Sequence, residues 1–258
     1  MKKEPIRYEE QVQKLAELLR SSERIVFFGG AGTSTESGIP DFRSAGGVFK
    51  GEEGKVPYPY PPEVMVSRSF FYQNTEMFYT FYRDKLIHPE AKPNHGHQVL
   101  AKLEEEGRLQ AVITQNIDGL HQLAGSREVI ELHGSIHRND CLSCRARYDL
   151  STVLHSSTNI PACPACGGML KPDVVLYEEA LHEEDIASAI HHVQAADLLI
   201  IGGTSLSVQP AASFVQMGRG ARIVLMNRTE TSMDWQAEAI FREPLGKLLA
   251  DAYQALKR

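Results

Sequence analysis

Short apolar runs that end in glycine or polar residues constrain the fold of this chain more than any other feature. Four of them lie at residues 25–28, 111–113, 198–201 and 223–226. Apolar side chains at helical spacing precede or separate these runs, at residues 12–19, 99–103, 186–193 and 248–256. Strands that alternate with helices assemble into a parallel sheet with helices on both faces. The chain is therefore predicted to have an α/β fold with a Rossmann-like, doubly wound parallel sheet.

The cysteines predict a metal centre. Cys141 and Cys144 form one C-x-x-C pair, and Cys163 and Cys166 form a second pair after 18 intervening residues. Two such pairs at this spacing are typical of a zinc ribbon, and four thiolates at tetrahedral corners leave no open position for water or substrate. We therefore expect these four residues to hold one structural Zn²⁺. A redox role for the pairs is the alternative.

Two segments interrupt the alternation of strands and helices. Residues 44–88 are rich in glycine, proline and tyrosine, and residues 135–171 contain the cysteines. Because both leave and re-enter the sheet at the carboxyl ends of strands, we expect them to form a smaller module beside the ligand-binding edge. A length of 258 residues suits one elaborated domain over 1–258. The expected Rossmann-like part covers 1–43, 89–134 and 172–258, and the small module combines a helical insert, 44–88, with the zinc ribbon, 135–171.

Charge and hydropathy disfavour several classes of protein. Lysine and arginine number 27 against 33 aspartate and glutamate, and the net charge of -6 disfavours broad electrostatic attachment to nucleic acid. No apolar run approaches the roughly 20 residues of a membrane helix, and polar residues rather than a signal-peptide core follow Met1. Four closely paired cysteines are unlike a secreted disulfide framework. We expect a cytoplasmic protein with no membrane partner and no direct sequence-specific binding to nucleic acid.

A glycine-rich loop, Gly29-Gly30-Ala31-Gly32-Thr33-Ser34-Thr35, follows the first apolar run. Small residues after a strand let backbone N–H groups approach a pyrophosphate, although a tight turn without a ligand explains the loop equally well. Thr35 stands where the third glycine of a dinucleotide motif would be, and no clear acidic residue ends a second strand roughly 20 residues later. The loop therefore disfavours an ordinary hydride-transferring dehydrogenase.

The residues after this loop carry a resemblance to a known family. They read Glu36-Ser37-Gly38-Ile39-Pro40-Asp41-Phe42-Arg43, and the stretch from Gly30 to Arg43 resembles the motif that wraps NAD in the sirtuins. Further motifs follow in family order, at residues 114–121, 131–134, 171–179 and 202–206, with the cysteine pairs between the expected neighbours. Because the motifs agree jointly over almost the whole chain, the resemblance is highly specific.

The resemblance implies a set of NAD-binding residues. They are Gly30, Ala31, Gly32, Thr35, Asp41, Phe42, Arg43, Gln115, Asn116, Ile117, Asp118, His133, Gly202, Thr204, Ser205 and Asn227. Among them, Asn116 and Asp118 would hold the nicotinamide side and take part in catalysis, and His133 would be the general base. Without the resemblance, Asn116 or Asp118 could simply cap a helix and Asn227 would be assigned to a strand-end turn.

Residues 171–179 resemble the family segment that pairs with the substrate backbone as an added strand. The implied substrate-binding residues are Val174, Val175, Tyr177 and Val208. The chain departs from the commoner family form because Tyr177 and Glu178 stand where phenylalanine and glycine often occur, which leaves the acyl and peptide preference open. Without the resemblance, residues 174–176 would be assigned to a core strand.

The activity that the resemblance implies is NAD-dependent protein lysine deacetylation. NAD would be a consumed co-substrate, cleaved to nicotinamide, and the acetyl group would pass from lysine to ADP-ribose; the partners would be acyl-lysine proteins or peptides. A specialist for acidic acyl groups would carry Tyr-x-x-Arg in the helical insert, where this chain has Tyr79-Thr80-Phe81-Tyr82 followed by Arg83. We therefore expect a neutral acyl group. The alternatives are a longer-chain or acidic deacylase, a mono-ADP-ribosyltransferase, and a non-catalytic sensor of NAD or ADP-ribose.

Overall fold

A parallel sheet of six strands organises the larger part of the molecule. The computed structural model describes residues 7–42, 47–48 and 58–258. The sheet comprises β1 (Ile25–Gly29), β2 (Leu109–Thr114), β3 (Val129–Glu131), β7 (Leu198–Gly202), β8 (Arg222–Met226) and β9 (Ala239–Phe241). Their order is β3-β2-β1-β7-β8-β9, and every neighbouring pair is parallel. The four predicted strands and the doubly wound α/β fold are confirmed, whereas no sequence pattern predicted β9.

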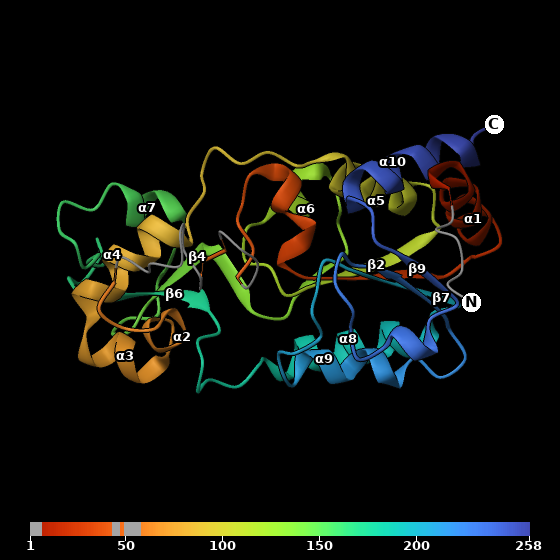
Figure 1. Ribbon diagram of the computed structural model, residues 1–258. Coiled ribbons are helices and arrows are strands. Elements are labelled where there is room, and N and C mark those ends of the chain that lie inside the picture. The colour runs from red at the N-terminus through yellow and green to blue at the C-terminus, as the bar shows by residue number, and fades with distance from the viewer. Residues whose placement is uncertain (1–6, 43–46, 49–57) are drawn as a thin grey trace.

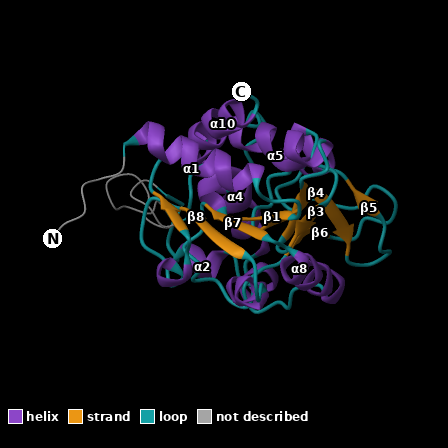
Figure 2. Ribbon diagram, turned by 90° about the vertical axis from the view of Figure 1, so that its right-hand side faces the viewer, coloured by secondary structure: helices purple, strands orange, loops and turns teal. Residues whose placement is uncertain are grey.

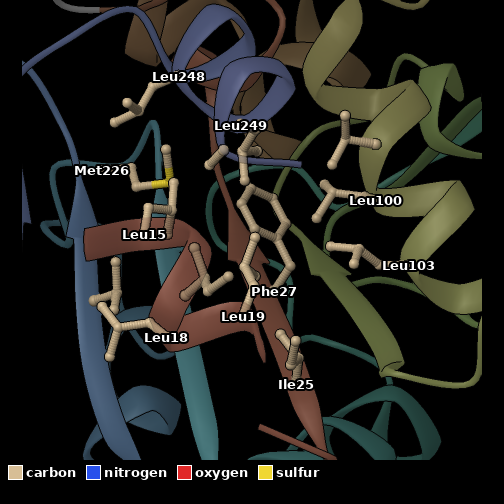
Figure 3. Packing of buried hydrophobic residues seen from close by; sticks show 14 of the residues in the cluster. Leu15, Leu18, Leu19, Ile25, Phe27, Leu100, Leu103, Met226, Leu248 and Leu249 are labelled. Atoms are coloured by element: carbon tan, nitrogen blue, oxygen red, sulfur yellow. The ribbon is translucent and has the colours of Figure 1, made fainter. Parts of the chain in front are cut away.

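Helices cover both faces of this sheet, as Figures 1 and 2 show. The helices α1 (Tyr8–Arg20), α5 (His95–Glu105) and α10 (Leu245–Leu256) lie on one face, and α8 (Glu183–Ala195) and α9 (Ala211–Phe214) lie on the other. Phe27 points from β1 into the first layer, where Leu19, Leu100 and Leu249 surround its ring (Figure 3). The four predicted helical segments are thus confirmed. Within the described part of the chain, no helix is long and apolar enough to cross a membrane.

A smaller module lies at the opposite end of the molecule from α1 and α10 (Figure 1). Its helices are α2 (Pro62–Met65), α3 (Arg68–Gln73), α4 (Thr75–Lys85) and α7 (Leu150–Leu154). An antiparallel sheet of three strands, β5 (Arg147–Tyr148), β4 (Gly134–Cys141) and β6 (Leu170–Val174), completes it. Phe71, Phe78 and Tyr79 lie in a hydrophobic core separate from those of the parallel sheet. The expected small module with a helical insert is therefore present.

The order of the parallel strands determines where a ligand can bind. From β1 the chain passes to β2 and β3 on one side, and it later returns to place β7 on the other side of β1. The carboxyl ends of β1 and β7 therefore flank the point where the connections diverge, which is where open α/β sheets hold ligands. Short helices leave these strand ends: η1 (Ala31–Thr33) and η2 (Thr35–Ser37) after β1, and α6 (Leu120–Ala124) after β2. Beyond β7 lie η4 (Val215–Met217) and η5 (Asp234–Gln236).

Candidate active site and metal centre

The glycine loops after β1 and β7 meet backbone to backbone. The Gly32 N–H donates to the Gly203 carbonyl at 2.8 Å, and the Gly30 N–H donates to the Gly202 carbonyl at 3.1 Å. A methyl group on Gly32 would lie 2.7 Å from the Gly203 Cα, and one on Gly30 would lie 2.8 Å from the Thr204 Cβ. These glycines are therefore required for close packing of the two loops, and their N–H groups are already used in it.

Gln115 and Thr204 join the ends of β2 and β7. The Thr204 hydroxyl donates to Gln115 Oε1 at 3.1 Å, which orients the amide and directs its nitrogen away from Thr204. Gln115 Nε2 is buried and has no hydrogen-bond partner among the described residues. A buried donor without an acceptor is costly in a protein interior, so this nitrogen is suited to receive a ligand oxygen such as a ribose hydroxyl.

A hydrogen-bonded relay links Asn116 to Asp118 through a serine. Asn116 Nδ2 donates to Ser34 Oγ at 3.1 Å, and the Ser34 hydroxyl in turn donates to Asp118 Oδ2 at 2.6 Å. The Leu120 N–H donates to the second carboxylate oxygen, Asp118 Oδ1, at 2.9 Å. The relay leaves the Asn116 carboxamide oxygen fixed in orientation at the carboxyl end of β2. Ser34 lies in the glycine-rich loop after β1, but no sequence pattern marked it as a site residue.

His133 follows β3 and is held in one orientation. Its Nδ1 lies 2.9 Å from the Gln115 backbone carbonyl. Because a carbonyl can only accept, Nδ1 carries the proton and Nε2 carries the lone pair. Burial lowers the pKa of His133 below its ordinary value, while the hydrogen bond to the Gln115 carbonyl opposes that shift. The imidazole is therefore neutral near pH 7, with the basic nitrogen opposite the anchored one.

Two buried histidines lie behind the Asp118 loop. His97 and His121 are 0% and 1% exposed, and their ring centroids are 4.6 Å apart. Burial lowers the pKa of His97 to about 4, with Asp118 opposing the shift, and lowers the pKa of His121 well below its usual range. Both rings are therefore neutral parts of the core.

Several other predicted NAD-binding residues contact neighbouring parts of the chain. Ile117 packs at the edge of the small module's core, as does Phe42, and the Asp41 carbonyl accepts from Val48 N–H at 2.8 Å. Thr35 donates its hydroxyl to the Gly32 carbonyl at 3.0 Å. Arg43, another predicted NAD-binding residue, lies outside the described residues.

Ser205 and Asn227, which follow β7 and β8, form hydrogen bonds within their own turns. Ser205 is exposed, and its hydroxyl lies 2.7 Å from that of Ser207. Asn227 Nδ2 donates to the backbone carbonyl and the hydroxyl of Thr229 at 3.0 and 3.2 Å. A contact from Asn227 to a ligand would therefore use its carboxamide oxygen or require the turn to open. Ala31 lies in η1, on the same edge of the sheet.

The predicted substrate segment leaves β6 and passes His133. Val174 is buried and pairs with Gly134, and the Val175 N–H donates to the His133 carbonyl at 2.9 Å. Tyr177 is 41% exposed, so its ring is available to a partner. Val208 lies in the loop between β7 and α9 and is half-buried. β6 ends at Val174, so residues 175–176, which the residue pattern alone would assign to a core strand, lie beyond it, and the segment continues from there to the exposed Tyr177.

The four cysteines converge in the small module. All four are free, and their sulfur atoms lie within 4.8 Å of one another. The Sγ atoms of Cys141 and Cys166 are 3.5 Å apart, and those of Cys144 and Cys163 are 3.7 Å apart. Thiolates around a tetrahedral Zn²⁺ at about 2.3 Å lie roughly 3.8 Å apart, so the set fits that ion. With four sulfur ligands the centre is suited to a structural role.

Comparisons with known proteins agree with this arrangement. A family model described as the Sir2 family matches residues 30–210. An NAD-dependent protein deacetylase of Clostridium acetobutylicum is 50% identical over 240 residues, which cover 93% of this chain and 97% of the relative. The protein of the same name from Clostridium perfringens is 51% identical over 242 residues, with coverage of 93% and 98%.

Solved structures give the same result. A Sir2 complex with a deacetylated p53 peptide and 3′-O-acetyl ADP-ribose has a TM-score of 0.86 and 36% sequence identity, and the match covers 95% of this chain and 98% of that chain. A complex of a Sir2 homologue with NAD has a TM-score of 0.83 and 34% identity, with coverage of 95% and 93%.

Proposed function

This chain belongs to the Sir2 family, the sirtuins, and we propose that it is an NAD-dependent protein lysine deacetylase. It cleaves NAD to nicotinamide and transfers the acetyl group of a modified lysine to ADP-ribose. Relatives that share half of its residues carry this name. One similar structure holds a deacetylated peptide and 3′-O-acetyl ADP-ribose, which are the products of such a reaction.

The observation that carries the proposal is the anchored imidazole of His133. With Nδ1–H donating to the Gln115 carbonyl, Nε2 is the atom that accepts a proton from a ribose hydroxyl. The depressed pKa keeps this nitrogen unprotonated at neutral pH. A sensor that only bound NAD or ADP-ribose would have no need of a base held in this tautomer.

NAD supplies a leaving group, nicotinamide, and a ribose that accepts the acyl group. The donor set of the chain fits that ligand, since an unpartnered buried amide, a fixed carboxamide oxygen and a carboxylate meet at one strand edge. We assign Asn116 and Asp118 to the nicotinamide side, Gln115 to the neighbouring ribose, and the loops after β1, β7 and β8 to the remainder of the dinucleotide.

The assignments in those loops follow the family motifs. Gly30, Ala31, Gly32, Thr35, Asp41, Phe42, Arg43, Ile117, Gly202, Thr204, Ser205 and Asn227 are the residues concerned. The peptide side is assigned to Val174, Val175, Tyr177 and Val208, with the exposed part of the segment as an added-strand partner. The cysteine centre is assigned to one structural Zn²⁺, which would fix the small module beside these residues.

The helical insert favours a neutral acyl group. Tyr82, at the position expected for an arginine in an acidic-acyl specialist, is fully buried, and the Tyr79 hydroxyl donates to the Leu170 carbonyl at 2.6 Å. The neighbouring Arg83 donates to the Asn159 backbone carbonyl and side chain, both at 2.7 Å. Its guanidinium therefore ties α4 to the loop before the second cysteine pair, and no residue of this group offers a cation for a succinyl or malonyl carboxylate.

Nicotinamide release by the purified protein tests the proposal. NAD is supplied with an acetyl-lysine or a succinyl-lysine peptide, and His133→Ala is compared with His155→Ala, an exposed histidine at the end of α7. We expect acetyl-peptide-dependent release that is lost in His133→Ala, by about 10²-fold or more, and retained in His155→Ala. Nicotinamide release that leaves the lysine acylated but attaches ADP-ribose to a protein would indicate ADP-ribosyl transfer. NAD binding without nicotinamide release would indicate a sensor.

The cell compartment and the excluded partners are also part of the proposal. Free cysteines clustered for a metal favour a reducing compartment, and we assign the protein to the cytoplasm. The predicted lack of sequence-specific nucleic-acid binding rests on the net charge of -6 and stays a prediction.

A further inference from the structure

Glu178 occupies a backbone conformation that favours glycine. Its φ angle is +74°, in the left-handed region where the Cβ of an ordinary residue crowds the following carbonyl. Glycine, which has no Cβ, would adopt this conformation without such crowding. A glutamate in this conformation indicates that contacts of its side chain stabilise it.

Those contacts reach across the small module to the start of α3. One carboxylate oxygen of Glu178 accepts from the Ser69 backbone N–H at 2.8 Å, and the other accepts from the Ser69 hydroxyl at 2.9 Å. Both are hydrogen bonds to an ionised acceptor, which are stronger than neutral ones. Glu178 is therefore tethered to the helical insert by both of its oxygens.

The backbone beside Glu178 strengthens the same connection. The Tyr177 N–H donates to the Val66 carbonyl, and the Arg68 N–H donates to the Tyr177 carbonyl, each at 3.0 Å. These bonds form an isolated parallel bridge between Ser67 and Tyr177. Figure 1 shows α2, α3 and β6 at the same end of the molecule. We call residues 66–69 and 177–178, with these four bonds, the insert clamp.

The clamp acts on the segment that passes the candidate base. Two residues before Tyr177, the Val175 N–H donates to the His133 carbonyl at 2.9 Å. On the other side, Glu179 accepts from the Leu176 N–H at 3.0 Å and from Lys171 Nζ at 3.1 Å. The segment is thus anchored to the base at one end and to the helical insert at the other, and Glu178 is its outermost tether.

We propose that Glu178 is a positioning residue for the acyl-lysine peptide, which holds the Tyr177 segment in its peptide-binding arrangement before the peptide arrives. This inference rests on the proposed deacetylase function. Ordering a loop on binding consumes part of the binding free energy, so a segment tethered in advance binds its peptide more tightly. The printed hydrogen bonds of the Glu178 side chain go to Ser69, which is not among the residues assigned to NAD, and its effect is therefore expected on the peptide alone.

Steady-state kinetics of Glu178→Gly test this inference. Glycine fits the φ of +74° but loses both bonds to Ser69. We expect the KM for the acetyl-lysine peptide to rise about tenfold, which corresponds to about 1.4 kcal/mol. The KM for NAD and the thermal midpoint should remain close to those of the wild type. Glu183→Gln, which changes an exposed carboxylate in the first turn of α8, is the matched control and should leave both KM values unchanged.

A second variant and a second readout separate positioning from a general structural effect. Ser69→Ala removes the hydroxyl but keeps the backbone donor, so we expect a smaller rise in peptide KM, about threefold, and no additional effect of Ser69→Ala in the Glu178→Gly background. Hydrogen exchange in Glu178→Gly should accelerate in fragments that contain Ser69 and Tyr177 and remain unchanged in β1.

The outcomes distinguish this inference from the function on which it rests. An active wild type whose peptide KM changes less than twofold in Glu178→Gly would overturn the positioning role. An equal rise in both KM values with a lower thermal midpoint would also overturn it, because the clamp would then be purely structural. A wild type that deacylates no peptide while it still binds NAD would overturn the proposed function itself.

Discussion

Replacing His97 with glutamine tests whether a buried neutral imidazole makes this protein sensitive to acid. His97 is fully buried and belongs to the capping box that begins α5. Its Nδ1 accepts from the Asn94 N–H at 3.3 Å, while Asn94 Oδ1 accepts from the N–H groups of Gly96 and His97. Protonation of Nδ1 would place a charge in the core and remove this acceptor. Both effects oppose the charged form, and burial is the larger cause of the pKa of about 4.

The size and sign of the effect follow from proton linkage. The ordinary pKa of histidine is 6.5, so the unfolded chain takes up this proton well before the folded protein does. The stabilisation that the neutral, buried His97 provides is therefore complete above pH 6.5 and is lost as the pH falls toward 4. Each pH unit in that window costs about 1.4 kcal/mol, so the contribution of His97 to the free energy of unfolding should fall by about 2 kcal/mol between pH 7 and pH 5.

Urea unfolding at pH 7 and pH 5 measures this difference. Glutamine at position 97 keeps an oxygen that can accept from the Asn94 N–H, as in common capping boxes, but does not titrate. We expect His97→Gln to lose about 2 kcal/mol less than the wild type between the two pH values. Loss of ring packing against His121 lowers the stability of the variant at both pH values and cancels in the comparison.

A matched control variant and one outcome decide whether the burial of His97 causes the loss of stability in acid. His191→Gln, on the exposed surface of α8, should retain the wild-type difference because its ring is solvated in both states. His121 is also buried with a lowered pKa, so His97→Gln should still lose some stability in acid. If His97→Gln and the wild type show the same difference between pH 7 and pH 5, the argument from burial is wrong.

Three further predictions concern the site. Burial lowers the pKa of His133, although the hydrogen bond to the Gln115 carbonyl opposes the shift. When kcat/KM is measured from pH 5 to 8, its acid limb should therefore have a midpoint below pH 6.5. A midpoint above pH 6.5 would contradict this. Ser34→Ala removes the link between Asn116 and Asp118 and should lower kcat for nicotinamide release about 10- to 100-fold, whereas an unchanged kcat would show that the relay is dispensable. The purified protein should contain one equivalent of zinc by elemental analysis. Removal of the zinc by a chelator should lower the thermal midpoint and alter the near-ultraviolet circular dichroism, because the small module would lose its metal centre. An unchanged thermal midpoint and an unchanged spectrum after removal would refute a structural metal.

The four strand segments that the sequence predicted are completely buried. Every residue of β1 and β7 is buried, because helices cover both faces of the sheet, and such strands appear as unbroken apolar runs. β9 has only three residues and lies at the edge, with Ile240 38% exposed, so no run marks it. The short helices α2 and α3 have too few turns to show a period, and they could be predicted only as parts of an insert.

The residue patterns indicated some of the contacts in the candidate site and missed others for a similar reason. The cysteine spacing sufficed because a metal imposes its own geometry on four ligands. The motif around Asn116 and Asp118 indicated a polar cluster, yet Ser34, which connects the two, comes from a different strand end. The glycines after β1 were expected to bring N–H groups to a ligand, whereas the contacts show packing against Gly203 that no local pattern reveals.

Glu178 shows how a departure from a family pattern can acquire a meaning only in three dimensions. In sequence, glutamate in place of glycine at a left-handed position suggests a cost of about 1 to 2 kcal/mol and nothing to offset it. In the fold, two hydrogen bonds from Ser69 to the Glu178 carboxylate offset that cost: at this exposed position each contributes about 0.5 to 1.5 kcal/mol, so the net effect on stability is small. Their partner, Ser69, lies 109 residues away, so no rule of local sequence could have paired them. The substitution thus exchanges the freedom of a glycine for a fixed connection between the helical insert and the substrate segment.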